Sequence, residues 1–98
     1  MIIMKHVVKR GGKKAMFSPA KLKGSIRGAC RDAHVPAART ARVVAKVAGH
    51  VMRSIAKRKT IRASDLRKKV LAGLRKTEPK AVKAWLAHEK RRRARRRR

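Results

Sequence analysis

Aromatic side chains are scarce in this chain. Among its 98 residues Phe17 and Trp85 are the only aromatic ones, and tyrosine is absent. Recognition of single-stranded nucleic acid by base stacking needs several exposed rings, so this scarcity argues against it. Both rings stand in apolar patterns, and we expect them in the core. Asparagine and glutamine are also absent, which removes the usual bidentate partners of adenine and argues against readout of base sequence.

Acidic residues are too few for the usual catalytic sets. Asp32, Asp65, Glu78 and Glu89 are the only four, and no two of them are close in the sequence. Asp65 and Glu78 stand at expected helix starts, where the helix dipole favours a negative charge. We therefore expect a protein without enzymatic activity.

Cysteine and histidine provide no metal site. Cys30 is the only cysteine, which excludes a disulfide within the chain and a cage of thiolate ligands. The four histidines are scattered without the spacing of metal ligands. Hydrophobic runs are short, and residues 1–4 do not resemble a signal peptide. We expect a cytoplasmic protein with no metal and no membrane contact.

Basic residues dominate the chain. Lys and Arg number 32 against four acids, which gives a formal net charge of +28. Eight of these cations fall in residues 90–98, so residues 1–89 still carry a net charge of +20. Self-repulsion on this scale opposes a compact state, and a bound polyanion relieves it. Nucleic acid is the partner that we expect.

The apolar pattern predicts an α+β fold that is mostly α. Residues 5–10 and 13–17 read as two short strands, and Gly11-Gly12 between them is a hairpin signal. Ser18-Pro19 predicts the start of a helix that ends at the His34-Val35-Pro36 break. We expect one domain over residues 1–89 and a separate Arg-rich tail over residues 90–98.

Three more helices follow in the predicted order. The second begins at Ala37 and carries the strongest apolar stripe, with Val47 and Met52 among its members. Residues 60–62 read as a short linker, for which an extended backbone is left open, before a third helix at Ala63. Thr77 is the expected cap of a fourth helix, which turns residues such as Trp85 and Leu86 inward.

This layout resembles the ATP-cone domain, a small regulatory module of many ribonucleotide reductases and of a bacterial repressor of their genes. The resemblance covers roughly residues 4–92. The motifs that carry it are Val8-Lys9-Arg10 with Gly12, Phe17, Lys21-Leu22, Ile61 with Asp65-Leu66 and Val70, and Ala84-Trp85-Leu86. It implies a β-hairpin followed by a four-helix body, in which the hairpin and first helix cradle ATP or dATP.

The same resemblance assigns roles to single residues. It places Lys9, Arg10 and Lys21 at phosphate-binding positions and Ser18 near another polar contact. The chain departs from the family pattern elsewhere: Gly11 stands where an acid is usual, and Ala63 replaces a hydroxyl that meets the nucleotide. Arg67 falls at the position of a further polar contact. The cations that hold phosphate are thus kept, while groups that recognise sugar and base are depleted.

A second, local resemblance covers residues 58–66. This stretch is similar to the loop and last helix of archaeal-type histones, where a Lys-Thr pair meets DNA phosphates. Here that pair is Lys59-Thr60. The expected helix from Ala37 to Lys57 is shorter than the central helix of a histone. The hairpin and fourth helix also have no place in that fold.

Together these features predict a non-enzymatic protein that contacts nucleic-acid phosphates with little sequence preference. We expect duplex DNA as its partner and DNA compaction in the nucleoid as its role. A structural RNA-binding protein of the ribosome and a stand-alone ATP- or dATP-binding module are the alternatives, and a homodimer is left open. The expected nucleic-acid contacts are Lys9, Arg10, Lys13, Lys14, Lys57, Arg58, Lys59, Arg62, Lys90, Arg91, Arg92, Arg93, Arg95, Arg96, Arg97 and Arg98.

Overall fold

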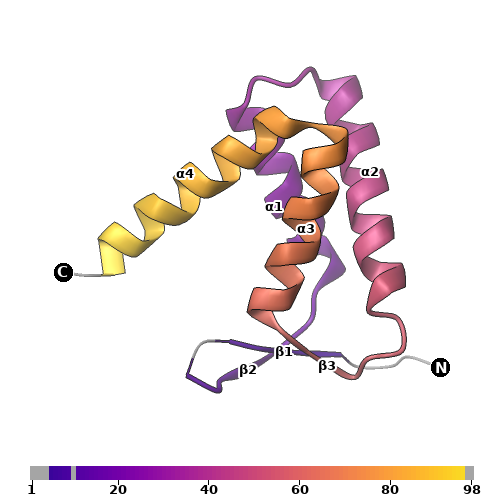
Figure 1. Cartoon of the computed structure of the whole chain (residues 1–98), viewed down its shortest axis with the longest axis vertical. Coiled ribbons are helices and arrows are strands. Elements are labelled where there is room, and N and C mark those ends of the chain that lie inside the picture. The colour runs from indigo at the N-terminus through magenta and orange to yellow at the C-terminus, as the bar shows by residue number, and fades with distance from the viewer. Residues whose placement is uncertain (1–4, 10, 97–98) are drawn as a thin grey trace.

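The fold is a small sheet at one end of four helices (Figure 1). A computed structural model describes residues 5–9 and 11–96, with the backbone alone for residues 95 and 96. The α+β class and the order of the predicted elements are confirmed. The elements are β1 (His6–Val8), β2 (Lys14–Met16), α1 (Pro19–Asp32), α2 (Ala37–Ser54), β3 (Thr60–Arg62), α3 (Ala63–Thr77) and α4 (Pro79–Arg96).

The sheet has one strand more than the predicted hairpin. Its order is β2-β1-β3, with β1 antiparallel to β2 and parallel to β3. Residues 60–62, expected as a linker, therefore form the third strand. Parallel neighbours need a long crossover, and here the chain between β1 and β3 includes α1 and α2.

The two faces of the sheet differ in character. Val7, Ala15 and Ile61 share one register across the three strands. Ile61 is only 3% exposed, so this face lies toward the helices. Side chains alternate along a strand, and the neighbouring register of Val8 with Lys14 and Arg62 therefore lies on the opposite face.

Helix α1 begins as its sequence predicts. Ser18 caps it by accepting a hydrogen bond from the backbone N–H of Lys21 at 3.3 Å, and Pro19 occupies the first turn. Leu22 and Ile26 are buried along its inner side. The cap and the apolar spacing together fix where α1 starts and which side it buries.

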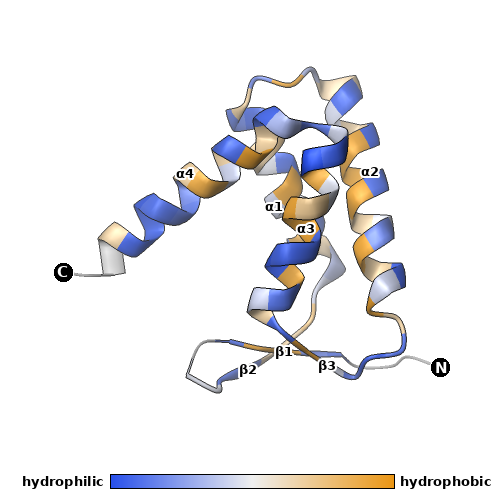
Figure 2. Ribbon diagram, in the orientation of Figure 1, coloured by the Kyte–Doolittle hydropathy of each residue, from blue (hydrophilic) through white to orange (hydrophobic). Residues whose placement is uncertain are grey.

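Helix α2 supplies the centre of an aliphatic core. Its buried residues are Thr40, Val43, Val44, Val47, Ala48 and Val51. Met52, which periodicity places in the same stripe, is 36% exposed. Figure 2 shows the hydrophobic sides of α1, α2 and α3 turned toward one another. Phe17 and Trp85 pack against the margin of this core, which confirms their predicted place.

The junction of α3 and α4 differs from the prediction. Thr77 does not cap α4: it is the last residue of α3, and its hydroxyl donates to the Gly73 carbonyl oxygen at 2.8 Å. The buried carboxylate of Glu78 pairs with Arg39 of α2 at 2.7 Å. The inward position predicted for Leu86 is also wrong, because this side chain is 41% exposed.

Helix α4 continues without a break through residue 89 to Arg96. Its beginning packs against the helix bundle, and its end projects from it (Figure 1). We call residues 90–96 the basic arm. The molecule measures 39 × 35 × 18 Å, so it is flat, and the arm and the hairpin extend to the same side of it. Within the described part of the chain, no helix combines the length and apolarity needed to traverse a bilayer.

Candidate phosphate-binding surface

The hairpin turn presents three exposed lysines. Gly11 and Gly12 adopt φ values of 87° and 83°, which side chains disfavour, and the backbone N–H of Lys9 donates to the Lys13 carbonyl oxygen at 2.7 Å. Lys9, Lys13 and Lys14 are exposed. Arg10 lies outside the described residues. The turn therefore holds these three cations at one edge of the molecule, where they are exposed among the described residues.

The sheet joins the hairpin cations to a second basic cluster. Lys14 and Arg62 both pair with Val8, from opposite sides of β1. Two strand spacings put their backbones about 10 Å apart, and their side chains share the outer face. The sequence predicted the two clusters separately. The third strand brings them together.

The loop before β3 extends this cluster. Lys57, Arg58 and Lys59 are exposed, as is Arg62 on the strand. The backbone N–H of His6 donates to the Lys59 carbonyl oxygen at 2.9 Å, which ties the loop to β1. We call Lys9, Lys13, Lys14, Lys57, Arg58, Lys59 and Arg62 the sheet-edge cations.

Lys5 has a structural role that the sequence analysis missed. Its ammonium group donates to the carbonyl oxygens of Ile55, Ala56 and Arg58, each at 2.8 Å. These carbonyls follow the last turn of α2, where the helix dipole favours a cation. No local signal identifies Lys5, because its partners lie about fifty residues further along the chain.

Two side chains that the ATP-cone resemblance assigns to nucleotide contacts form hydrogen bonds within the protein instead. Arg67 of α3 donates through Nε to both carboxylate oxygens of Glu89 in α4, at 3.0 and 2.8 Å. The Ser18 hydroxyl oxygen accepts from Lys21 as the α1 cap. Lys21 itself is exposed, and Ala63 offers only a methyl group. Exposed cations thus stand at the positions that the resemblance assigns to phosphate, while the side chains at the positions for further polar contacts are engaged elsewhere or apolar.

The Arg67–Glu89 pair also shifts the titration of its members. Burial by itself raises the pKa of Glu89, but the hydrogen bond and charge of Arg67, together with Trp85 and the charge of Arg93, outweigh it, so the pKa lies below its ordinary value. The hydrogen bond to Glu89 raises the pKa of Arg67 despite partial burial. The pair therefore fastens α4 to α3 just before the basic arm begins.

The basic arm carries its cations on several sides of the helix. Lys90, Arg91, Arg92 and Arg93 are all exposed. Consecutive helical residues point about 100° apart, so these four cover the helix circumference. Arg95 and Arg96 continue the helical backbone. Arg97 and Arg98 lie outside the described residues.

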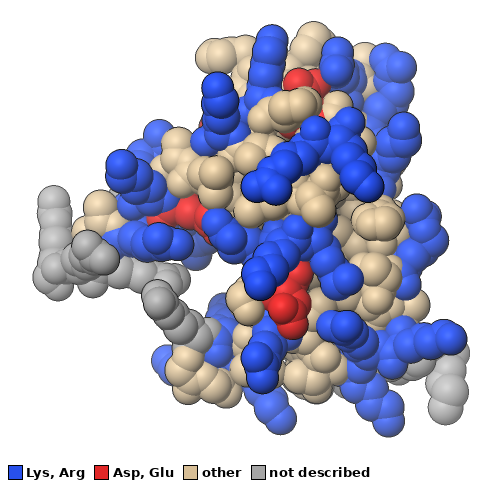
Figure 3. Space-filling view, in the orientation of Figure 1, with Lys and Arg blue, Asp and Glu red and all other residues tan. Residues whose placement is uncertain are grey.

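Half of the acidic residues form ion pairs within the fold. Glu78 and Glu89 each form an ion pair, and the remaining acids are Asp32 and Asp65. Lys and Arg side chains spread over the whole visible face (Figure 3). The described ranges 5–9 and 11–96 contain no group of three His, Cys, Asp or Glu side chains that could hold a metal ion.

Two hollows lie between helices, away from the hairpin. One, of about 520 Å³, lies between α1 and α2. The other, of about 230 Å³, lies between α1 and α4 beside Trp85 and Glu89. Neither is lined by a residue of the hairpin.

Comparison with known proteins identifies a family. The sequence model of the ATP cone domain matches residues 5–94, which include every described strand and helix except the end of the basic arm. A search of curated proteins found no match to this chain.

Proposed function

The chain belongs to the ATP-cone family, and from this premise we propose that it is a non-enzymatic, duplex-binding form of that fold. It contacts the nucleic-acid backbone with little preference for base sequence. The observation that carries the proposal is the charge imbalance of 32 basic against four acidic residues, two of the acids being consumed in ion pairs. A duplex supplies the dense negative charge that such a surface needs.

The basic arm suits a groove of the duplex. A helix with its side chains is about 10–12 Å across, close to the width of the major groove of B-DNA. Because Lys90 to Arg93 cover the helix circumference, cations reach the phosphates on both sides of a groove. Arginine dominates the arm, and its planar fork makes strong contacts to phosphate oxygens.

The sheet-edge cations provide a second contact. The hairpin turn extends to the same side of the flat molecule as the arm, so one duplex can meet both, while the loop between α2 and β3 lies toward the other side (Figure 1). Lys14 and Arg62 share the outer face of the sheet. Contacts to phosphates position a protein without reading bases, which agrees with the absence of Asn and Gln.

Neutralisation of the arm tests the proposal. The triple variant Arg91→Gln, Arg92→Gln, Arg93→Gln is compared with Arg42→Gln, Lys46→Gln, Arg53→Gln, which removes the same charge from exposed positions of α2. We expect the arm variant to reduce the slope of log K against log salt by about 2–3 on a DNA duplex. The α2 variant changes the slope less. If the two triple variants reduce the slope equally, the arm is not the contact.

RNA is the alternative duplex. Backbone contacts made by the arm and the sheet-edge cations also fit an A-form helix, whose phosphates carry the same charge. Sequencing the nucleic acid that co-purifies with the full chain separates the two. Chromosomal DNA supports the nucleoid role, whereas enrichment of ribosomal RNA assigns the protein to the ribosome instead.

A nucleotide-binding regulatory module is the second candidate, and the family match favours it. Lys9 and Lys21 are exposed and would hold the phosphates of ATP or dATP. Calorimetry with ATP, dATP and GTP on the wild type and on Lys9→Ala tests this function. Saturable binding that requires Lys9 and distinguishes ATP from GTP supports it. Weak binding of all nucleoside triphosphates alike supports duplex binding, because a basic surface attracts any polyphosphate.

A further inference from the structure

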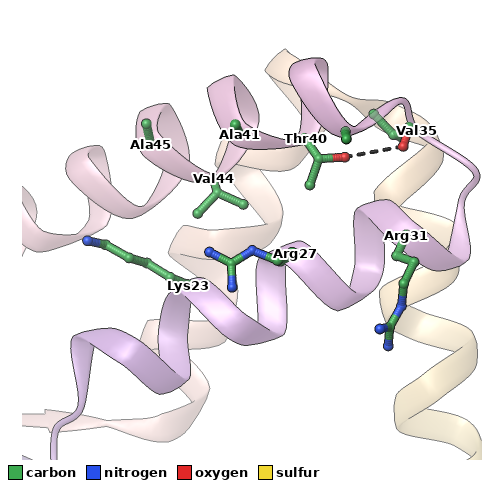
Figure 4. A pocket seen from close by; sticks show the side chains of 9 residues that line it. Lys23, Arg27, Arg31, Val35, Thr40, Ala41, Val44 and Ala45 are labelled. Carbon is green, nitrogen blue, oxygen red and sulfur yellow. Dashed lines mark hydrogen bonds between the residues drawn. The ribbon is translucent and has the colours of Figure 1, made fainter.

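The larger hollow is a groove along α1 and α2 that the proposed duplex contact does not use. It has a volume of about 520 Å³. Its two walls differ in chemistry, as Figure 4 shows. Lys23, Arg27 and Arg31 line it from α1, and Ala37, Ala41 and Ala45 line it from α2.

The α1 wall is cationic. Its three basic residues are spaced four apart, so they follow one side of the helix. All three are exposed. Lys23 and Arg27 reach along the groove, whereas Arg31 turns away from α2 (Figure 4). None of them pairs with an acid among the described residues.

The α2 wall is apolar and made of small side chains. Its three alanines are also spaced four apart, and Val44 lies between the walls. Small side chains let another helix approach α2 closely. Met52 follows Ala45 by seven residues, or two turns, and is 36% exposed, so it prolongs the same apolar side of α2.

We propose that this groove docks an α-helix of a partner protein. The helix is acidic on the side that meets α1 and small and apolar on the side that meets α2. From Ala37 to Ala45 the alanine wall is about 12 Å long. It therefore accommodates two to three turns of a partner helix.

A second copy of the chain does not fit this description. Its acids stand at positions 32, 65, 78 and 89, so none of its helices offers acids four residues apart. A duplex is also a poor fit, because the alanine wall gives phosphates nothing to contact. Arg42 and Lys46 of α2 each follow a groove alanine by one residue, which rotates them about 100° away from it.

The probe is a designed helical peptide with glutamate at every fourth position and alanine and leucine on the adjacent side. A scrambled peptide of the same composition is the comparator, because a chain of charge +28 attracts any acidic peptide. We expect the amphipathic peptide to bind the full chain roughly tenfold more tightly in fluorescence anisotropy. Equal affinities for the two peptides would overturn the proposal.

Two variants of α2 locate the binding. Ala41→Gln places a longer side chain in the groove, while Ala38→Gln makes the same change at an exposed position that does not line it. The ratio of the affinities for the amphipathic and the scrambled peptide falls toward one in Ala41→Gln and stays near the wild-type ratio in Ala38→Gln. Thermal melts of both variants show that they are folded. If the two variants behave alike, the groove is not the site.

Arg27→Gln and Arg42→Gln separate a protein partner from a duplex. Arg27 lines the groove and Arg42 does not. The proposal expects Arg27→Gln to weaken the amphipathic peptide more than Arg42→Gln does, with equal effects of the two on a short DNA duplex. If Arg27→Gln selectively weakens the duplex and not the peptide, the groove belongs to the nucleic-acid surface and the proposal fails.

Discussion

Lys5 illustrates how the role of one cation depends on its surroundings. Lys5 directly precedes β1 and Lys9 directly follows it, yet only Lys5 donates to backbone carbonyl oxygens, three of them just after the end of α2. Such contacts fix the chain that follows α2 against the start of β1. We therefore assign Lys5 to the stability of the fold and not to phosphate binding.

Substitution of Lys5 tests this assignment. Lys5→Met keeps the aliphatic stem but removes all three hydrogen bonds, and it should lower the free energy of unfolding by about 1–3 kcal/mol. Lys9→Met removes the same charge from the exposed turn and should not destabilise the fold, since it relieves repulsion. Chemical denaturation at one salt concentration compares them. Equal stabilities of the two variants would contradict the assignment.

Glu89 predicts a pH dependence of stability. Because the folded pKa lies below its ordinary value of 4.5, the carboxylate stabilises the fold at higher pH and loses this effect as the pH falls through the folded value. The difference in melting temperature between wild type and Glu89→Gln should thus be present near pH 7 and disappear as the pH falls through the folded pKa, which lies below 4.5. If this difference in melting temperature does not change with pH, the ion pair of Glu89 with Arg67 does not stabilise the fold.

At the scale of elements, Gly73 controls the approach of α3 to α2. A Cβ added at Gly73 would lie 3.1 Å from Cγ1 of Val47, a side chain that is 1% exposed. A β-branched residue in a filled core has little freedom to move. At Gly24 of α1 an added Cβ meets no atom within 4 Å. The two glycines therefore form a matched pair for testing this packing.

Alanine at each glycine should have different effects. Gly24→Ala should stabilise by up to about 1 kcal/mol, because alanine favours the helix. In Gly73→Ala the same helix preference is offset, because the added methyl group overpacks the core and lowers the free energy of unfolding by about 1–3 kcal/mol. Thermal unfolding of the two variants measures the difference. If Gly73→Ala is as stable as Gly24→Ala, α2 and α3 are less tightly packed than the structure indicates.

Elements that neighbouring residues encode were predictable from the sequence, whereas elements that depend on contacts with distant residues were not. Ser18-Pro19 and the apolar stripe of α2 encode their helices directly, and both are confirmed. The three-residue strand around Ile61 exists only because β1 pairs with it across about fifty residues. The prediction that Thr77 caps α4 was wrong because a threonine hydroxyl can also donate to a carbonyl oxygen of its own helix, and here it donates to that of Gly73.

The sequence predicted which residues form the candidate surface, but not which of its basic clusters lie next to each other. Each basic cluster is visible as a run of Lys and Arg, whereas the union of Lys14 with Arg62 requires the register of the sheet. The commitment of Arg67 to Glu89 depends on how α4 crosses α3. Distances between elements decide both, and a periodic pattern within one element contains no such information.

At the scale of the whole molecule, an ATP-cone fold carries a charge that a single nucleotide cannot balance. A triphosphate offers about four negative charges, while the chain carries +28. The hairpin turn and the basic arm also lie at separate places on the same side of the flat molecule (Figure 1). The excess of positive charge is the main physical reason to favour a duplex over a nucleotide as the ligand.

A salt series of binding to a mixed-sequence DNA duplex tests this reading most directly. If six to eight of the described cations each neutralise a phosphate, log K falls against log salt with a slope of about −5 to −7. Duplexes of different sequence give the same slope and similar affinities. An affinity that barely changes between about 50 and 200 mM salt, or one that depends strongly on the base sequence, would contradict binding through the phosphate backbone.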